Sequence, residues 1–242
     1  MRIGVIGAGH IGGNCARQAL KGGHQVMLSF ARDPSTLTAL AAELGPGASV
    51  GTPADAVARC DVVIFSVPWG AIPDALAQAG DLGGKVVVDT TNQFGSGSMP
   101  EPGQTAASLN AARMRGARYV KSFNTLTSRF QEDAAERNGD ERVVQWMCGD
   151  DPEAKALVAG LIEDMGYVPI DLGGTATCAV MEAPRRDGAV YGEEYRAADA
   201  QAVIEAVRAG TAIPPVPVYV TPRTAQAQAP APAPGRPRRA GG

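Results

Sequence analysis

The sequence predicts an α/β protein with a doubly wound, mainly parallel sheet. Short apolar runs alternate with amphipathic stretches, which is the pattern of strands and helices that follow one another along the chain. Runs such as V-V-I-F and V-V-V show no polar alternation, as is typical of strands covered by helices on both faces. With 242 residues and 45% apolar side chains, the chain is long enough to bury a sizeable core.

The individual elements follow from these patterns. Apolar runs predict strands at residues 2–6, 25–30, 61–66, 85–89, 118–122 and 142–148, and a last short one in Y-V-P-I-D-L. Amphipathic stretches predict helices at residues 11–21, 34–44, 70–79, 106–114, 153–165 and 193–209. Asp33 and Asp151 are placed to cap two of these helices, each followed by a proline at the first helical position.

The chain is expected to divide into three parts. Residues 1–172 form the nucleotide-binding domain, and residues 173–220 form a small, mainly helical C-terminal annex that completes the substrate pocket. V-P-V-Y-V in this annex contains too much proline for a central strand. Residues 221–242 are rich in Pro, Ala and Arg and are expected to be a disordered tail.

Charge and composition exclude several classes of protein. The formal net charge is −3, but the tail holds four arginines and no acid, so residues 1–220 carry 18 basic and 25 acidic side chains. This acidic body argues against nucleic-acid binding, and no apolar run approaches the roughly 18 residues of a membrane span. Four scattered cysteines and two histidines predict no metal site, and they indicate buried free thiols in a cytoplasmic protein.

The glycine-rich run G-A-G-H-I-G-G begins at Gly7, directly after the first expected strand. A strand, this run, a helix and a second strand in that order predict a Rossmann-type dinucleotide site. Gly7 permits a tight turn, Gly9 lets the pyrophosphate approach the backbone, and Gly12 lets helix and strand pack closely. His10 and Ile11 open the helix, whose free N–H groups bind the phosphates, and we assign His10 no acid–base role.

The end of the second strand selects the cofactor. An acid is expected there for NAD, yet the chain has Ser29, Phe30 and Ala31, followed by Arg32. A guanidinium can form two hydrogen bonds to a 2′-phosphate and stack on adenine, so Arg32 favours NADP. Asp33 is better explained as the cap of the next helix.

Six motifs carry a family resemblance, in order over about the first 170 residues. They are G-V-I-G-A-G-H-I-G, A-R-D-P, F-S-V-P-W-G-A-I-P, V-V-D-T-T-N, V-K-S-F-N-T-L and M-C-G-D-D-P-E-A-K. With these, the chain resembles the NADPH-dependent reductases of coenzyme F-420, a 5-deazaflavin. It also resembles the related cytosolic oxidoreductase domain of the six-transmembrane metalloreductases.

The resemblance implies a set of residues around the nicotinamide half of NADP. Those expected to line its ribose and ring or to hold its carboxamide are Ser66, Val67, Pro68, Asn92, Phe123, Asn124 and Thr125. One departure is Ala31, where relatives carry a small hydroxyl residue, so that the 2′-phosphate is left with Arg32 and Ser29. Structural alternatives stay open: core packing for Trp69 and Phe123, a turn or strand-end cap for Asn92 and Asp89, and local hydrogen bonds for Thr90, Thr91 and Thr125.

Hydride transfer between a nicotinamide and a deazaflavin needs little proton chemistry, so no catalytic side chain is expected. The leading hypothesis is an NADP-dependent oxidoreductase, a cytoplasmic homodimer, with coenzyme F-420 or a flavin-like small molecule as its co-substrate. One alternative keeps NADPH but reduces another acceptor, such as free flavin, a ferric chelate or an imine. A second alternative is a non-catalytic dinucleotide-binding sensor, which needs no second pocket.

Overall fold

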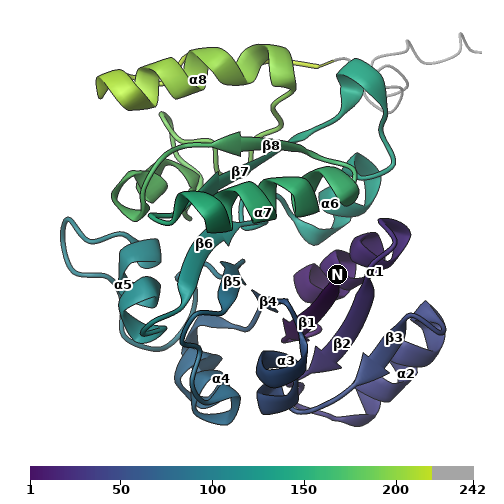
Figure 1. The fold of residues 1–242 in the computed structure, drawn as a ribbon. Helices are drawn as coiled ribbons and strands as arrows, with labels where there is room; N and C mark the ends of the chain where they lie inside the picture. Colours follow the sequence, from purple (N-terminus) through teal and green to yellow (C-terminus); the bar gives the residue numbers. More distant parts are fainter. Residues whose placement is uncertain (220–242) are drawn as a thin grey trace, which may run out of the picture.

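A computed structural model describes residues 1–219 of the chain (Figure 1). The expected disorder of residues 221–242 lies outside the described residues. The described part contains an eight-stranded sheet with the strand order β3-β2-β1-β4-β5-β6-β7-β8. Neighbouring strands pair in parallel except for β6 and β7, which are antiparallel. The predicted doubly wound α/β fold is confirmed.

The first part of the chain builds one half of the sheet, the adjacent strands β3, β2, β1 and β4. Its elements are β1 (Arg2–Ile6), α1 (His10–Lys21), β2 (Gln25–Ser29), α2 (Ser35–Leu44), β3 (Ala48–Val50), α3 (Pro53–Arg59) and β4 (Val62–Phe65). The middle part adds η1 (Trp69–Ala71), where η denotes a short 3₁₀ helix, followed by α4 (Ile72–Ala79), β5 (Val86–Asp89), α5 (Ala106–Arg113) and β6 (Arg118–Ser122).

The last part of the chain extends the sheet beyond β6 and adds the annex. Its elements are α6 (Ser128–Ala134), η2 (Gly139–Glu141), β7 (Val144–Cys148), α7 (Pro152–Asp164), β8 (Val168–Asp171), η3 (Thr175–Met181) and α8 (Ala197–Ala209). All of the predicted strands are present within a few residues. The expected helix 193–209 begins four residues later, at Ala197.

Sequence patterns missed β3, α3 and α6, which are short. β3 has three residues, and α3 and α6 have seven each, too few for a period to be visible. Thr52 nevertheless marks the start of α3, because it forms a capping box with Asp55. The signal for α3 was therefore a cap rather than an amphipathic pattern.

Helices cover both faces of the sheet, and alternate strand residues point to each face. On β4, Val63 and Phe65 pack in the cluster that contains residues of α3, α4, α5 and α8. Val62 and Ile64 pack in the opposite cluster with residues of α1, α2, α6 and α7. Strands β1, β4 and β5 are buried on both faces, which explains their unbroken apolar sequences.

The strand order locates the region where a ligand is expected. From β1 the chain proceeds outward to β2 and β3, then crosses back to β4 on the other side of β1. In open α/β sheets, ligands bind at such a reversal, beside the carboxyl ends of the strands. Ile6 pairs with Phe65 at this edge, so Gly7 and Ser66 follow directly from neighbouring strands.

The cysteines differ from the expectation. Cys148 at the end of β7 and Cys178 in η3 form a disulfide, with their Cα atoms 6.0 Å apart. The prediction of four free thiols is therefore wrong for this pair, because the fold brings together residues that lie far apart in the sequence. Cys15 and Cys60 are free and buried, and burial raises the pKa of Cys15 to about 12.

None of the helices in residues 1–219 combines the length and the apolar character that crossing a membrane requires.

Candidate functional site

The glycine loop joins β1 to α1, and two of its glycines are required by the fold itself. Gly7 has a φ of 95°, and a Cβ there would lie 2.3 Å from the Ser66 carbonyl oxygen. A Cβ on Gly12 would lie 2.1 Å from the Gly7 carbonyl oxygen. Both distances are far shorter than a van der Waals contact, so any side chain at these positions forces the backbone to move.

Gly9 differs from its two neighbours in the motif. A Cβ at this position would meet no atom within 4 Å. Gly9 is the N-cap of α1, and its φ of −73° is one that other residues adopt easily. The fold therefore does not need glycine here, whereas a ligand approaching the free N–H groups of the helix does. His10 is exposed and Ile11 is half-buried at the start of this helix.

The turn after β2 carries the residues expected at the adenosine ribose. Phe30 has a φ of 59°, an unusual conformation for a non-glycine residue, and it ends the strand one residue earlier than predicted. Ser29 is fully buried, and its hydroxyl donates to the Val5 carbonyl at 3.1 Å, so its side chain bonds within the sheet. Arg32 is exposed, and no ion pair to it exists among residues 1–219.

Asp33 was predicted to cap a helix that begins at Pro34, but α2 begins at Ser35 with Pro34 as its N-cap. Asp33 therefore lies one residue before the cap and bonds to the first residue of the helix. Its Oδ1 accepts hydrogen bonds from the Ser35 amide at 2.9 Å and from the Ser35 hydroxyl at 2.8 Å. These bonds hold the pKa of Asp33 below its ordinary value. Of the two candidates in A-R-D-P, Arg32 is thus the one whose head group is left for a ligand.

The end of β4 continues the same edge of the sheet. Ser66 is half-buried, and its Oγ accepts a hydrogen bond from the Thr90 hydroxyl at 2.9 Å. The Val67 side chain is buried against the glycine loop, and Pro68 is exposed. Trp69 is buried and its indole donates to the Ser98 carbonyl, so it belongs to the core.

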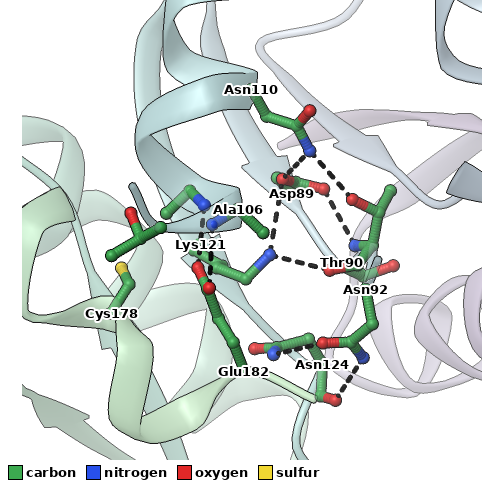
Figure 2. Close-up of polar contacts among 12 residues, drawn as sticks. Asp89, Thr90, Asn92, Ala106, Asn110, Lys121, Asn124, Cys178 and Glu182 are labelled. Atoms are coloured by element: carbon green, nitrogen blue, oxygen red, sulfur yellow. Dashed lines mark hydrogen bonds and ion pairs between the residues drawn. The ribbon is translucent and has the colours of Figure 1, made fainter. Parts of the chain in front are cut away.

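At the ends of β5 and β6, Asn92 and Asn124 bond to each other (Figure 2). Asn92 Nδ2 donates to the Asn124 carbonyl at 2.9 Å, and Asn124 Nδ2 donates to Asn92 Oδ1 at 3.0 Å. The annex joins this pair, because Asn124 Nδ2 also donates to the Met181 carbonyl at 2.6 Å. Two of the residues expected near the nicotinamide, Asn92 and Asn124, are therefore hydrogen-bonded to each other, and the Met181 carbonyl of the annex is bonded to Asn124.

Three buried polar atoms in this region have no hydrogen-bond partner among the described residues: Gln93 Oε1, Asn124 Oδ1 and Thr125 Oγ1. Leaving a buried acceptor unpaired costs about 1–3 kcal/mol. A carboxamide such as that of nicotinamide supplies the N–H donors that these oxygens lack. These unpaired acceptors thus fit the nicotinamide end of NADP, as the open space at Gly9 fits its phosphates.

Phe123 lies at the turn between β6 and Asn124, with a φ of 57°. Its ring is 1% exposed and packs edge-to-face against Tyr167, with the centroids 6.0 Å apart. The ring is thus a core group, and the contribution of Phe123 to the site is its backbone turn. The Phe123 carbonyl accepts a hydrogen bond from Gln131 at 2.9 Å, which fixes that turn.

Sequence reasoning named Asp89 as a possible strand-end cap, which its bond to the Thr91 amide bears out, but it missed the roles of Lys121 and Tyr119 beneath the site. Asp89 and Lys121 are both fully buried, and Tyr119 donates to Asp89 Oδ2 at 2.6 Å. Burial, followed by the charge of Asp89, raises the pKa of Tyr119 well above its ordinary value. A lysine within a strand predicted to be buried was the available signal.

Glu182 is a second missed residue. Its carboxylate is 4% exposed and accepts from the Ala106 amide at 2.8 Å and the Ala107 amide at 2.7 Å (Figure 2). These are unpaired N–H groups at the start of α5, so the annex carboxylate caps a helix of the main sheet. Among residues 1–219, no three His, Cys, Asp or Glu side chains are grouped closely enough to hold a metal ion.

The geometry agrees with what comparisons with known proteins show. Residues 2–93 match the family described as NADP oxidoreductase, coenzyme F420-dependent. The metalloreductase STEAP3 of Rattus norvegicus is 28% identical over 182 residues, which cover 75% of this chain and 36% of that protein. The chain thus spans about a third of the length of this curated relative.

Solved structures show the same relationship. The hypothetical protein SMa0349 of Sinorhizobium meliloti is 26% identical, with a TM-score of 0.72 over 81% of this chain and 95% of that one. A protein from Arthrobacter, described as a putative F420-dependent NADP reductase, is 26% identical, with a TM-score of 0.62 over 73% and 86% of the two chains.

A reductive aminase of Aspergillus terreus, solved with NADPH, is 25% identical, with a TM-score of 0.54 over 72% of this chain and 55% of that one. The predicted resemblance is confirmed over the matched residues, and the expected enzyme class is that of an NADP-dependent oxidoreductase.

Proposed function

We propose that this chain, whose residues 2–93 match a family of F420-dependent NADP oxidoreductases, transfers a hydride between NADPH and coenzyme F-420 or a flavin-like acceptor. When bound, NADPH supplies the hydride, so the protein need only bind the two rings and exclude water. The single observation that carries the proposal is Gly9. The fold leaves open space for a side chain there, and a ligand that approaches the start of α1 closely accounts for its absence.

Different residues along the carboxyl edge of the sheet bind different parts of NADPH. Gly7, Gly9 and Gly12 shape the backbone for the pyrophosphate, and the amides at the start of α1 bind it. Arg32 binds the 2′-phosphate through its two-pronged guanidinium. Asn124 Oδ1 and Thr125 Oγ1 accept hydrogen bonds from the carboxamide and thereby orient the nicotinamide ring.

The choice of a deazaflavin or flavin-like acceptor rests on the family match and on the Arthrobacter relative. The reductive aminase and the metalloreductase are named for other reactions, so we keep an imine and a ferric chelate as alternative acceptors. Reduction of an imine and reduction of a deazaflavin each consume one proton together with the hydride. In an imine the proton goes to the nitrogen bonded to the reacting carbon, whereas in a deazaflavin it goes to a ring nitrogen that is not bonded to that carbon and can take it from solvent. The proposed reaction and its alternatives can therefore be distinguished by measuring which acceptor the protein reduces.

The test is to mix the purified protein with NADPH and oxidised F-420 and to follow the deazaflavin absorbance. Parallel reactions contain free flavin, a ferric chelate or a cyclic imine in place of F-420. Turnover of F-420 well above the other acceptors supports the proposal, and preferred turnover of another acceptor replaces it. Tight NADPH binding without turnover of any acceptor identifies a sensor instead.

Cofactor choice has its own test in the variant Arg32→Ala. Loss of charge-assisted hydrogen bonds to a phosphate is expected to weaken NADPH binding about 10- to 100-fold. NADH lacks this phosphate, so its affinity should change less than about twofold. Equal losses for both cofactors, measured by fluorescence titration, would show that Arg32 does not bind the 2′-phosphate.

We also retain the cytoplasm and a homodimer as parts of the proposal. The Cys148–Cys178 disulfide removes the support that four free thiols would have given to the cytoplasm. Light scattering after size-exclusion chromatography tests the dimer. Fractionation of cells that produce the full chain tests the location. A monomer, or a protein in another compartment, would remove the corresponding part and leave the proposed reaction unchanged.

A further inference from the structure

Thr91, between β5 and Asn92, is held on both sides of its backbone by a buried ion pair. Asp89 Oδ1 accepts from the Thr91 amide at 2.8 Å, and Lys121 Nζ donates to the Thr91 carbonyl at 2.7 Å (Figure 2). The two charged groups lie 3.6 Å apart, and neither side chain has any exposed surface. The peptide units before and after Thr91 are therefore fixed at once.

Other buried groups complete this arrangement. Asn110 Nδ2 donates to Thr91 Oγ1 at 3.0 Å and to Asp89 Oδ2 at 2.9 Å. Tyr119 donates to the same Asp89 oxygen from the neighbouring strand. Replacing a buried ion pair by well-packed apolar side chains often leaves a fold as stable or more stable, so stability alone does not explain the pair here.

The position that follows Thr91 is that of Asn92. Asn92 Oδ1 accepts one hydrogen of the Asn124 amide, and the Met181 carbonyl accepts the other. Both N–H groups of the Asn124 side chain are thus occupied, and its Oδ1 is left as an acceptor with no partner among the described residues. A shift of Asn92 would free the Asn124 amide to rotate and reverse this polarity.

We propose that Asp89 and Lys121 are positioning residues for the nicotinamide end of the cofactor. They fix Thr91, Thr91 fixes Asn92, and Asn92 holds Asn124 with its oxygen available to a primary carboxamide. The inference rests on the proposed function, because the carboxamide is that of NADPH. It adds that the site recognises the carboxamide through an amide whose orientation is set by a buried charge pair.

The experiment compares NADPH with 2′,5′-ADP, which lacks the nicotinamide half. The variant is Lys121→Met combined with Asp89→Asn, which removes both charges and leaves a side-chain oxygen for the Thr91 amide. We expect NADPH affinity to fall about tenfold, the effect of about one hydrogen bond. The affinity for 2′,5′-ADP should change less than about twofold, because the adenosine end is unaltered.

Tyr119→Phe is the matched control, because it removes a buried hydrogen bond to Asp89 but leaves both contacts to Thr91. It should lower the denaturant midpoint and leave the ratio of the two affinities unchanged. An unchanged ratio in the double variant, or an equal change in Tyr119→Phe, would overturn the inference. Failure of the wild-type protein to bind NADPH while it binds 2′,5′-ADP would overturn the proposed function first.

Discussion

At the glycine loop, the shape of the proposed site comes from missing side chains, whereas at the ends of β5 and β6 it comes from buried polar ones. Gly7 and Gly12 let backbone segments touch, and Gly9 leaves open space beside a helix. Asp89, Lys121 and Glu182, in contrast, bond backbone groups from beneath. In the proposed site, a charged pyrophosphate would thus be bound by an open backbone, whereas a carboxamide would need side chains of fixed polarity.

The largest effect is expected for Gly12→Ala, which tests whether the loop tolerates any added atom. The new Cβ would lie 2.1 Å from the Gly7 carbonyl oxygen, and relief requires movement of the backbone. We expect a loss of about 3 kcal/mol or more in the free energy of unfolding, measured by urea denaturation. Gly13→Ala is the control, because its Cβ would have its nearest neighbour at 3.7 Å, and an alanine there should stabilise α1.

Gly9→Ala separates the fold from the ligand at the same loop. A Cβ here meets no protein atom within 4 Å, so the free energy of unfolding should change by less than about 0.5 kcal/mol. The methyl group instead occupies the space of the pyrophosphate, and NADPH affinity should fall about 10- to 100-fold. Unchanged affinity in a fluorescence titration would mean that the phosphates do not approach this helix.

Glu182→Gln tests the region at the ends of β5 and β6, where buried polar side chains define the shape of the proposed site. The change keeps the volume but removes the charge that accepts from the amides of Ala106 and Ala107. We expect a loss of about 2 kcal/mol in the free energy of unfolding. Glu163→Gln, at an exposed position on α7, should have almost no effect. Equal losses of unfolding free energy in the two variants would argue that the Glu182 carboxylate does not stabilise the contact between the annex and α5.

The smallest effect concerns Asp33 and depends on pH. Its hydrogen bonds to Ser35 lower its pKa in the folded state, so they stabilise the fold when the carboxyl is ionised. This stability is complete above the ordinary carboxyl pKa of about 4 and is lost as pH falls through the lower folded value. Asp33→Asn keeps an acceptor but does not titrate, so its denaturant midpoint should decline less than that of the wild type in acid.

The geometry around the proposed adenosine end could be predicted from the sequence because its determinants are local. Gly7, Gly9, Gly12 and Arg32 lie within one strand-helix-strand unit, where spacing along the chain fixes spacing in space. Asp33 was predicted as the N-cap; the N-cap is Pro34, but Asp33 does bond to the first helical residue, Ser35. Ser29 was the exception: strand alternation turned its hydroxyl into the sheet.

The nicotinamide end could be predicted only in part. Asn92 and Asn124 were identified from the family motifs, but their mutual hydrogen bonds depend on the pairing of β5 with β6. Glu182 could not be found, because its partners lie about 75 residues earlier in the chain, and a lone acid in an irregular segment has no pattern. Lys121 stood in a motif, but nothing in the sequence shows that its ammonium reaches Thr91.

The contact of the annex with Asn92 has a consequence for the order in which the protein assembles. The Ala183 amide donates to Asn92 Oδ1 across 91 residues, whereas the glycine loop is complete within the first four strands. Closing a long loop costs more conformational entropy and delays a contact during folding. The glycine loop therefore depends only on contacts within the first part of the chain, whereas the proposed nicotinamide end also depends on the annex.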